Sequence, residues 1–160
     1  MQPFKEIEES YNNPDPWGYQ SNRDDILRRD ILIDISKRFG PYERCLDIGA
    51  GEGWITKMYP AKEIFGYELS HQAAARFPPN VNRATVIKGK YDLICATGVF
   101  YRHYDWRTFL NIIKTHASKH VLVSSIEDWE IPEVNKIGKV LYETRYKYRD
   151  WNQRTRMFEV

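Results

Sequence analysis

The chain has 160 residues, of which 42% are hydrophobic, 14% aromatic and 29% charged, and its formal net charge is +2. This length predicts a single domain spanning 1–160, and the aromatic content excludes a disordered chain. The longest apolar runs are only a few residues long, too short to cross a bilayer. The first ten residues mix charges of both signs without an apolar stretch, and both cysteines fall within apolar runs. We therefore expect a reduced, cytoplasmic protein without a secretory signal.

The charge is unevenly distributed along the chain. Residues 1–43 carry a net charge of −3, whereas residues 136–160 carry seven basic and three acidic side chains. A basic end of this kind can bind nucleic acid or an acidic protein partner, or it can be the solvated face of a terminal hairpin. The solvated face is the simpler interpretation.

The first half of the chain predicts a loop followed by helices and strands. Apolar residues from Ile26 to Phe39 recur every three or four positions, which is typical of an amphipathic helix, and Gly40-Pro41 ends it. In chain order, we expect a loop at 11–22, a helix at 24–39, a strand at 44–48, a brief helix at 54–59, a strand at 63–68 and a short helix capped by Ser70.

The second half continues the alternation and ends in two long alternating segments. The expected elements are strands at 84–87 and 91–96, a helix at 105–118, a strand at 121–125, and a hairpin of 139–149 with 153–159. Strands that alternate with helices indicate a parallel sheet covered on both faces. The predicted fold class is therefore α/β, with a doubly wound, mostly parallel seven-stranded sheet that ends in an antiparallel C-terminal hairpin.

A glycine-rich segment directly follows the first predicted strand. It reads Asp47-Ile48-Gly49-Ala50-Gly51-Glu52-Gly53. Glycines at this position let the backbone turn tightly and approach a ligand closely. The spacing differs from the dinucleotide fingerprint G-x-G-x-x-G, and the preceding acid suits a cationic ligand such as an α-ammonium group.

A second acid, Glu68, ends the next strand about twenty residues downstream, where a carboxylate can accept hydrogen bonds from both ribose hydroxyls. An amino-acid site followed by a ribose site describes S-adenosylmethionine (SAM). The segment 47–53 together with Gly66-Tyr67-Glu68 resembles motifs I and II of class I SAM-dependent methyltransferases. The resemblance implies their Rossmann-like fold and SAM as cofactor, with S-adenosylhomocysteine (SAH) as product.

A narrower resemblance covers residues 11 to about 126. Asp15-Pro16-Trp17, an acid and a base at Asp25 and Arg28, and the segments 91–94 and 97–101 are similar to the nodulation-type (NodS-like) N-methyltransferases. Those enzymes methylate an amine of a chito-oligosaccharide. Where their pattern has a glutamate after the fourth strand, this chain has Gly98, so the substrate is not carried over.

The cofactor is expected to contact residues from four parts of the chain. Tyr11, Trp17 and Tyr19 belong to a lid and substrate segment at 1–23 that precedes the core at 24–160, and Arg28 is the candidate for the methionine carboxylate. Leu69, Ile87 or backbone groups are candidates for the adenine. The predicted cofactor-binding residues are Trp17, Arg28, Asp47, Gly49, Ala50, Gly51, Gly53, Glu68, Leu69 and Thr97.

The acceptor is expected at the carboxyl ends of the fourth and fifth strands. His103 is the candidate general base there, and Tyr101 is a second catalytic candidate or a lining residue. Methyl transfer from a sulfonium needs no metal, and none is expected. His116 and His120 have metal-ligand spacing without a third partner, so we interpret both as surface residues.

Three functions remain open from the sequence. The first is a SAM-dependent methyltransferase (EC 2.1.1.-) acting on an amine or hydroxyl of a small, sugar-like acceptor. The second is a catalytically silent SAM-binding module that regulates a partner, which Gly98 favours. The third is an RNA methyltransferase that binds phosphates through the basic C-terminal hairpin, at Arg145, Lys147 and Arg149.

Overall fold

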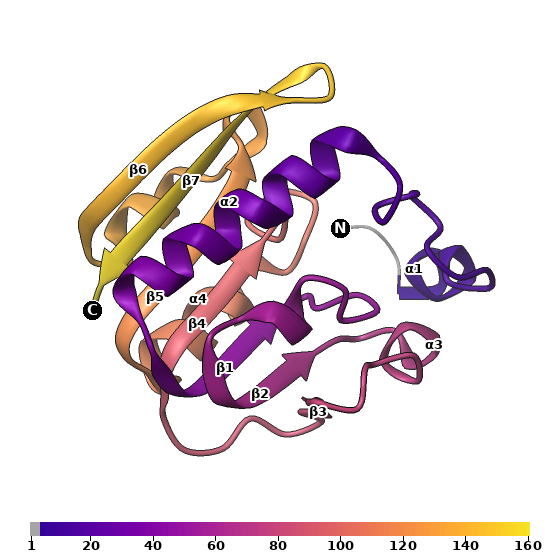
Figure 1. Cartoon of the computed structure of the whole chain (residues 1–160), viewed down its shortest axis with the longest axis horizontal. Helices are drawn as coiled ribbons and strands as arrows, with labels where there is room; N and C mark the ends of the chain where they lie inside the picture. Colours follow the sequence, from indigo (N-terminus) through magenta and orange to yellow (C-terminus); the bar gives the residue numbers. More distant parts are fainter. Residues whose placement is uncertain (1–3) are drawn as a thin grey trace.

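The computed structural model describes residues 4–160, and a seven-stranded sheet forms its centre (Figure 1). The strand order is β3-β2-β1-β4-β5-β7-β6. Strands β1 to β5 are parallel, whereas β7 is antiparallel to both β5 and β6. The strands are β1 (Tyr42–Ile48), β2 (Ala61–Tyr67), β3 (Val81–Arg83), β4 (Tyr91–Thr97), β5 (Ala117–Ile126), β6 (Lys139–Tyr148) and β7 (Trp151–Glu159). The predicted doubly wound sheet with its antiparallel hairpin is confirmed.

Residues 4–160 also form four α-helices, two of which precede the first strand, and three 3₁₀ turns. Asn22 caps the longest helix by accepting hydrogen bonds from the amides of Asp24 and Asp25, and Ser70 caps α3 through the amide of Ala73. The helices are α1 (Phe4–Ser10), α2 (Arg23–Phe39), α3 (His71–Ala74) and α4 (Trp106–His116), and the 3₁₀ turns are η1 (Thr56–Met58), η2 (Glu127–Trp129) and η3 (Pro132–Lys136). Within residues 4–160, no helix is both long enough and apolar enough to span a bilayer.

The two largest apolar clusters of the core lie on opposite faces of the sheet. Alternate residues of a strand point to opposite faces. On β1, Cys45 therefore packs in the layer beneath α2, while Leu46 and Ile48 pack in the layer beneath α4. Asp47 shares a face with Cys45, so its carboxylate lies on the α2 side, at the carboxyl end of the strand.

Two predicted elements are wrong. The third strand is not at 84–87 but at Val81–Arg83, which pairs with β2; beyond it the chain leaves the sheet, and Val86 is 66% exposed. The brief helix at 54–59 is reduced to the single 3₁₀ turn η1 before Pro60. Helix α1 was not predicted.

The polar side chains of Glu52 and Arg76 bind the segment that precedes α2. Glu52 accepts a hydrogen bond from the amide of Asp15 (2.9 Å) and pairs with Arg76 (2.8 Å). Arg76 also donates to the carbonyl of Tyr11 (2.9 Å). The glycine-rich segment and the start of the chain are thus joined directly.

Candidate active site

A cavity of about 340 Å³ lies at the carboxyl ends of β1, β2 and β4. Its size falls within the range of small-molecule sites, and its place at the carboxyl edge of a parallel sheet is where such folds bind ligands. In Figure 1 the arrowheads of β1 and β2 point toward the side on which α1 lies. Residues of the glycine-rich segment and of the N-terminal segment both line the cavity.

The glycine-rich segment turns sharply where it borders the cavity. Gly49 has φ +74°, and a Cβ there would lie 2.6 Å from Cγ1 of Val99, so only glycine fits without a shift. Gly49, Ala50 and Gly51 line the cavity. Gly53 does not; a Cβ there would meet Pro78 at 2.8 Å, which indicates a packing role instead.

Two backbone amides position the carboxylate of Glu68. Its Oε2 accepts a hydrogen bond from Gly51 and its Oε1 accepts one from Ser70, both at 2.8 Å. Burial raises the pKa of this half-buried carboxyl above its usual range, while the amides oppose the shift. Each oxygen can accept one more hydrogen bond, and Glu68 lines the cavity. An acid that binds the ribose hydroxyls requires both properties.

Asp47 is a buried acid with one unsatisfied oxygen. Its side chain lines the cavity and is 3% exposed. Oδ2 accepts a hydrogen bond from the Thr56 hydroxyl at 2.7 Å, but Oδ1 has no partner among the described residues. Burial raises the pKa of Asp47 to about 7. A buried carboxylate oxygen without a donor is costly, so a cationic donor in the cavity would satisfy it.

Arg28 brings a positive charge to the same cavity. Its side chain is buried, lies 3.3 Å from Oδ1 of Asp25, and stacks near the rings of Tyr19 and Tyr148, at 5.4 and 4.9 Å from their centroids. The Nε atom has no hydrogen-bond partner among the described residues. The neighbouring acid and phenols raise the pKa of Arg28 despite its burial. A carboxylate ligand could therefore bind a guanidinium that is already oriented.

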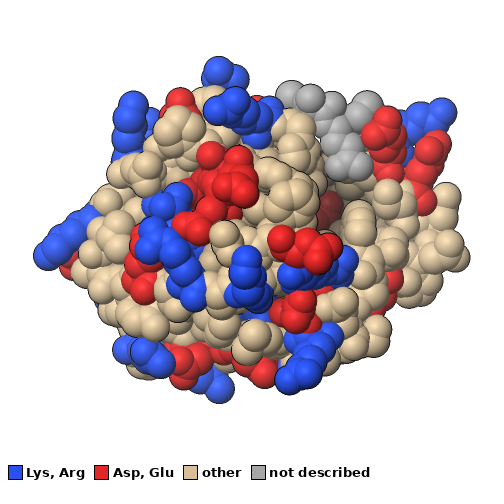
Figure 2. All heavy atoms as spheres, turned by 90° about the horizontal axis from the view of Figure 1, so that it is seen from above, with Lys and Arg blue, Asp and Glu red and all other residues tan. Residues whose placement is uncertain are grey.

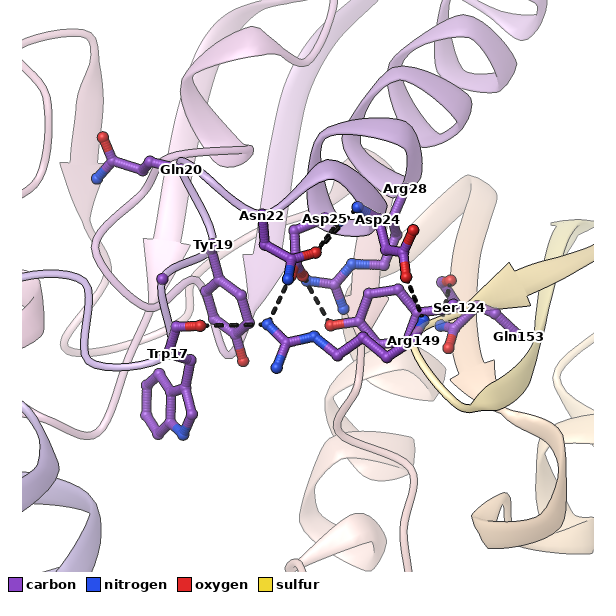
Figure 3. A network of polar contacts seen from close by, with 12 residues as sticks. Trp17, Tyr19, Gln20, Asn22, Asp24, Asp25, Arg28, Ser124, Arg149 and Gln153 are labelled. Carbon is purple, nitrogen blue, oxygen red and sulfur yellow. Dashed lines mark hydrogen bonds and ion pairs between the residues drawn. The ribbon is translucent and has the colours of Figure 1, made fainter.

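The tip of the C-terminal hairpin joins this group. Asp25 is fully buried and accepts hydrogen bonds from the Tyr148 hydroxyl and from Arg149, both at 2.7 Å. Arg149 also donates to the carbonyl of Trp17 at 3.2 Å. Figure 3 shows Asp25, Arg28 and Arg149 gathered beside the ring of Tyr19. This role of the hairpin was not predicted.

The three aromatic residues expected in the lid all line the cavity. Tyr11 is 6% exposed and meets Trp17 edge-on at 5.1 Å between ring centroids, and Trp17 stacks on Tyr19 at 5.6 Å. Leu69 and Thr97 also line the cavity, whereas Ile87 packs in the α4-side layer. Of the predicted cofactor contacts, Gly53 and the adenine candidate Ile87 are outside the lining.

The two catalytic candidates lie beside the cavity and not in its lining. The hydroxyl of Tyr101 accepts a hydrogen bond from the amide of Ile126 at 3.0 Å, and burial raises its pKa to about 12. His103 is exposed and stacks on Tyr101 at 5.7 Å. The neighbouring Tyr104 and Gly98 do line the cavity. The space beside Gly98 is open, because the atom nearest to a Cβ there would be the Tyr101 hydroxyl oxygen, 4.0 Å away.

Candidate metal ligands do not converge within residues 4–160, where no group of three or more His, Cys, Asp and Glu side chains could hold an ion. His116 is half-buried, and its Nδ1 lies 2.7 Å from the carbonyl of Gly89. His120, expected at the surface, is 7% exposed, and its Nδ1 lies 3.0 Å from the Tyr42 hydroxyl. The surface interpretation of His120 is wrong because β5 begins four residues earlier than predicted.

Comparisons with known proteins agree with this fold. The methyltransferase domain family model matches residues 19–157, and the chain therefore belongs to this family. The structure resembles the N-methyltransferase NodS from Bradyrhizobium japonicum WM9 in complex with SAH, with a TM-score of 0.81 at 18% identity over 98% of this chain and 97% of that one. The comparison with curated protein sequences finds no match.

Other solved structures share the fold at lower identity. Magnesium protoporphyrin IX methyltransferase (ChlM) from Synechocystis PCC 6803, with bound SAM, has a TM-score of 0.73 at 14% identity over 99% of this chain and 97% of that one. The [4+2]-cyclase SpnF has a TM-score of 0.65 at 10% identity over 84% and 80%. The predicted resemblance to class I SAM-dependent methyltransferases, and among them to NodS, is confirmed. SpnF illustrates that one fold hosts different reactions.

Proposed function

We propose that this chain transfers a methyl group from SAM to an amine or hydroxyl of a small, sugar-like acceptor. The observation that carries the proposal is the convergence of Asp47, Glu68 and Arg28 on one cavity. Asp47 has an oxygen without a partner among the described residues, which suits the ammonium group of SAM. Glu68 is held by two backbone amides and suits the ribose, and the unpaired Nε of Arg28 suits the carboxylate.

Each group of the cofactor has a candidate partner in this arrangement. Glu68 would accept hydrogen bonds from the ribose hydroxyls, Asp47 would accept one from the α-ammonium, and Arg28 would bind the carboxylate. Gly49, Ala50 and Gly51 leave room for the methionine part of SAM, and Leu69 offers an apolar contact for the adenine. Thr97, the last residue of β4, also lines the cavity and would lie on the side from which the acceptor approaches.

Bound SAM supplies a methyl group on an electrophilic sulfonium. The chain's own contribution is to orient the reactants and exclude water. Tyr11, Trp17 and Tyr19 line the cavity and would shield bound SAM from water, and the faces of such rings attract a cation. The acceptor would enter beside Gly98 and Tyr104, where the lining leaves space.

Tyr101 and His103 remain the candidates for handling the acceptor's proton. The Tyr101 hydroxyl accepts a hydrogen bond from the Ile126 amide. Because its pKa is raised, the hydroxyl stays protonated at neutral pH and would donate a hydrogen bond to the acceptor. His103 is the exposed titratable group next to it and would accept a proton from an ammonium acceptor before transfer.

The alternatives rest on weaker features. A silent SAM-binding module would keep the cofactor residues and methylate nothing. For RNA methylation, the hairpin would need free positive charge, but Arg145 pairs with Glu127 and Glu143, and Arg149 pairs with Asp25. Charges of both signs are interspersed on the face shown in Figure 2. The small-molecule acceptor is therefore preferred.

Methyl transfer with labelled SAM tests the proposal. Amines, aminosugars, neutral sugars and RNA are offered in parallel to the wild-type protein and to His103→Ala, Tyr101→Phe and the control Lys147→Ala. We expect label in an amine or sugar, less of it with the first two variants, and no change with the control. Binding of SAH without any labelled product would favour the silent module, and salt-dependent labelling of RNA would favour the third function.

A further inference from the structure

A second cavity, of about 380 Å³, lies between α4 and the 3₁₀ turn η3, and we call it the α4 groove. Its volume is close to that of the candidate active site and falls within the range of small-molecule sites. Its lining comes from α4, between Trp106 and Lys114, and from η3 with the residue that follows it, between Glu133 and Ile137. Among the described residues, none lines both cavities, so the α4 groove is a separate place on the molecule.

The groove exists because the segment beside α4 is short. Among the described residues, α4 is the one α-helix that contributes to the apolar cluster on its face of the sheet. The connection between β5 and β6 contains the 3₁₀ turns η2 and η3, of three and five residues. A turn of five residues cannot cover the side of an 11-residue helix, so part of that side stays open.

The floor of the groove is apolar. Leu110 and Ile113 are 9% and 2% exposed, and the half-buried side chains of Trp106 and Ile137 pack against the same apolar cluster. Along α4 the lining extends from residue 106 to residue 114, which is about 12 Å of helix at the usual rise per residue. A floor of this length, with three aliphatic side chains, suits an extended alkyl chain.

The rim of the groove is positively charged. Arg107, Lys114 and Lys136 are exposed, and together with Glu133 they give the lining a formal net charge of +2. Within residues 4–160, none of these three cations forms an ion pair. Unpaired positive charge around an apolar floor is complementary to an anion with an apolar body.

Arg107 is oriented by its neighbour Trp106. Its guanidinium lies over the indole ring, with 4.3 Å between Cζ and the ring centroid. An arginine stacked in this way keeps the N–H groups at its edge free, and two of them match the two oxygens of a carboxylate. Arg107 also belongs to the first turn of α4, where the helix dipole favours an anion.

We propose that the α4 groove binds a medium-chain alkyl carboxylate. The chain lies along Leu110, Ile113 and Ile137, and the carboxylate pairs with Arg107. This site is separate from the cavity in which the methyl group would be transferred, so the proposal holds whether or not the chain methylates an acceptor.

Indole N–H signals of the full chain test the proposal, because Trp106 is the one tryptophan that lines the α4 groove. Trp17 and Trp54 line the candidate active site and report binding there instead. Each signal is assigned from a Trp→Phe variant. Decanoate is the probe, and 1-decanol and decylamine are its uncharged and cationic counterparts, all used below the concentrations at which they aggregate.

We expect decanoate to shift the Trp106 signal along a saturable curve and to leave Trp17 and Trp54 unchanged. The uncharged 1-decanol should bind about tenfold more weakly, because it cannot accept a charge-assisted hydrogen bond from the guanidinium. Decylamine should bind more weakly still, because its ammonium group is repelled by the rim.

Two variants separate the role of the charge from that of the floor. Arg107→Gln should weaken decanoate about tenfold and leave 1-decanol unchanged, whereas Ile137→Ser should weaken both. Lys37→Gln, which removes an exposed cation of α2, is the matched control and should change neither. The signals of the other tryptophans show that each variant is folded.

Three results would overturn the proposal. The first is that decanoate leaves Trp106 unshifted, or binds no better than 1-decanol and is unaffected by Arg107→Gln. The second is that decanoate shifts Trp17 and Trp54 and is displaced by SAH, which would place it in the candidate active site. The third is that Trp106 shifts on dilution of the protein alone, or with phosphatidylglycerol vesicles but not with decanoate. These last results would assign the groove to a second copy of the chain or to a membrane.

Discussion

Arg149, at the tip of the β6–β7 hairpin, donates a hydrogen bond of 2.7 Å to the fully buried carboxylate of Asp25 in the first turn of α2 (Figure 3). The same guanidinium contacts the carbonyl of Trp17, which lines the cavity. The end of the chain therefore holds its beginning in place above the site. Binding should depend on the hairpin even though Arg149 itself does not line the cavity.

Arg149→Ala should accelerate SAH dissociation severalfold, because the Trp17 loop loses its contact with the hairpin. The free energy of unfolding should fall by about 1.5–3 kcal/mol, because the buried carboxylate of Asp25 loses one charge-assisted hydrogen bond while it keeps its contacts with Arg28 and Tyr148. Stopped-flow Trp fluorescence measures the dissociation rate. Lys147→Ala, an exposed basic residue of the same hairpin, is the matched control, and equal rates for the two variants would refute the coupling.

Asp25→Ala should lower the free energy of unfolding by about 3–5 kcal/mol, because it leaves the buried Arg28 without its acid. Urea unfolding followed by circular dichroism measures this loss. Asp34→Ala removes an exposed acid of the same helix that pairs with Arg38, and it should cost under about 1 kcal/mol. Similar losses at both positions would show that Asp25 has no special role.

Asp47 should make stability and cofactor affinity depend on pH. Burial raises its folded-state pKa from 3.8 to about 7, so the folded chain keeps a proton that the unfolded chain releases in this range. The free energy of unfolding contributed by this group should therefore fall as the pH rises from about 4 to about 7. Asp47→Asn should remove that fall, as urea titrations at several pH values would show.

The same proton opposes binding of an ammonium group. SAH affinity should increase between pH 6 and pH 7.5, as Asp47 ionises, and Asp47→Asn should be weaker and nearly independent of pH in this interval. Isothermal titration calorimetry at matched ionic strength measures both. A wild-type affinity that is flat over this range would contradict the assignment of Asp47 to the ammonium.

Gly49→Ala should destabilise the fold for two separable reasons. Its φ of +74° strains any other residue by about 1–3 kcal/mol, and the new Cβ would meet Val99 at 2.6 Å. In a double-mutant cycle, Gly49→Ala with Val99→Ala should cost less than the sum of the two single changes. Additive losses in urea unfolding would show that the contact with Val99 is unimportant.

The sheet could be predicted because most of its strands are short apolar or alternating runs that helices and turns separate. The third strand could not be placed, since Val81–Arg83 buries only Val81, whereas the neighbouring Ala84-Thr85-Val86-Ile87 has the more typical strand composition. At the edge of a sheet, pairing with β2 decides the position of such a short strand more than its own sequence does.

The local parts of the site were also predictable. Asp47, the glycines and Glu68 follow their strands within a few residues, so their sequence spacing fixes their position. The contact between Asp25 and Arg149 spans 124 positions and has no local pattern. The same holds for Trp129 and Trp151, which come together only because η2 and the hairpin tip meet at one end of the sheet.

The central claim is that Glu68 and its neighbours bind SAM, and calorimetric titration of SAH into wild-type protein, Glu68→Ala and Glu63→Ala tests it most directly. Glu63 is an exposed acid of β2, the strand that Glu68 follows, and serves as the control. Loss of two charge-assisted hydrogen bonds predicts that Glu68→Ala binds about 100-fold more weakly than wild type, with Glu63→Ala unchanged. Absence of binding by the wild type, or equal affinity of all three proteins, would contradict the account.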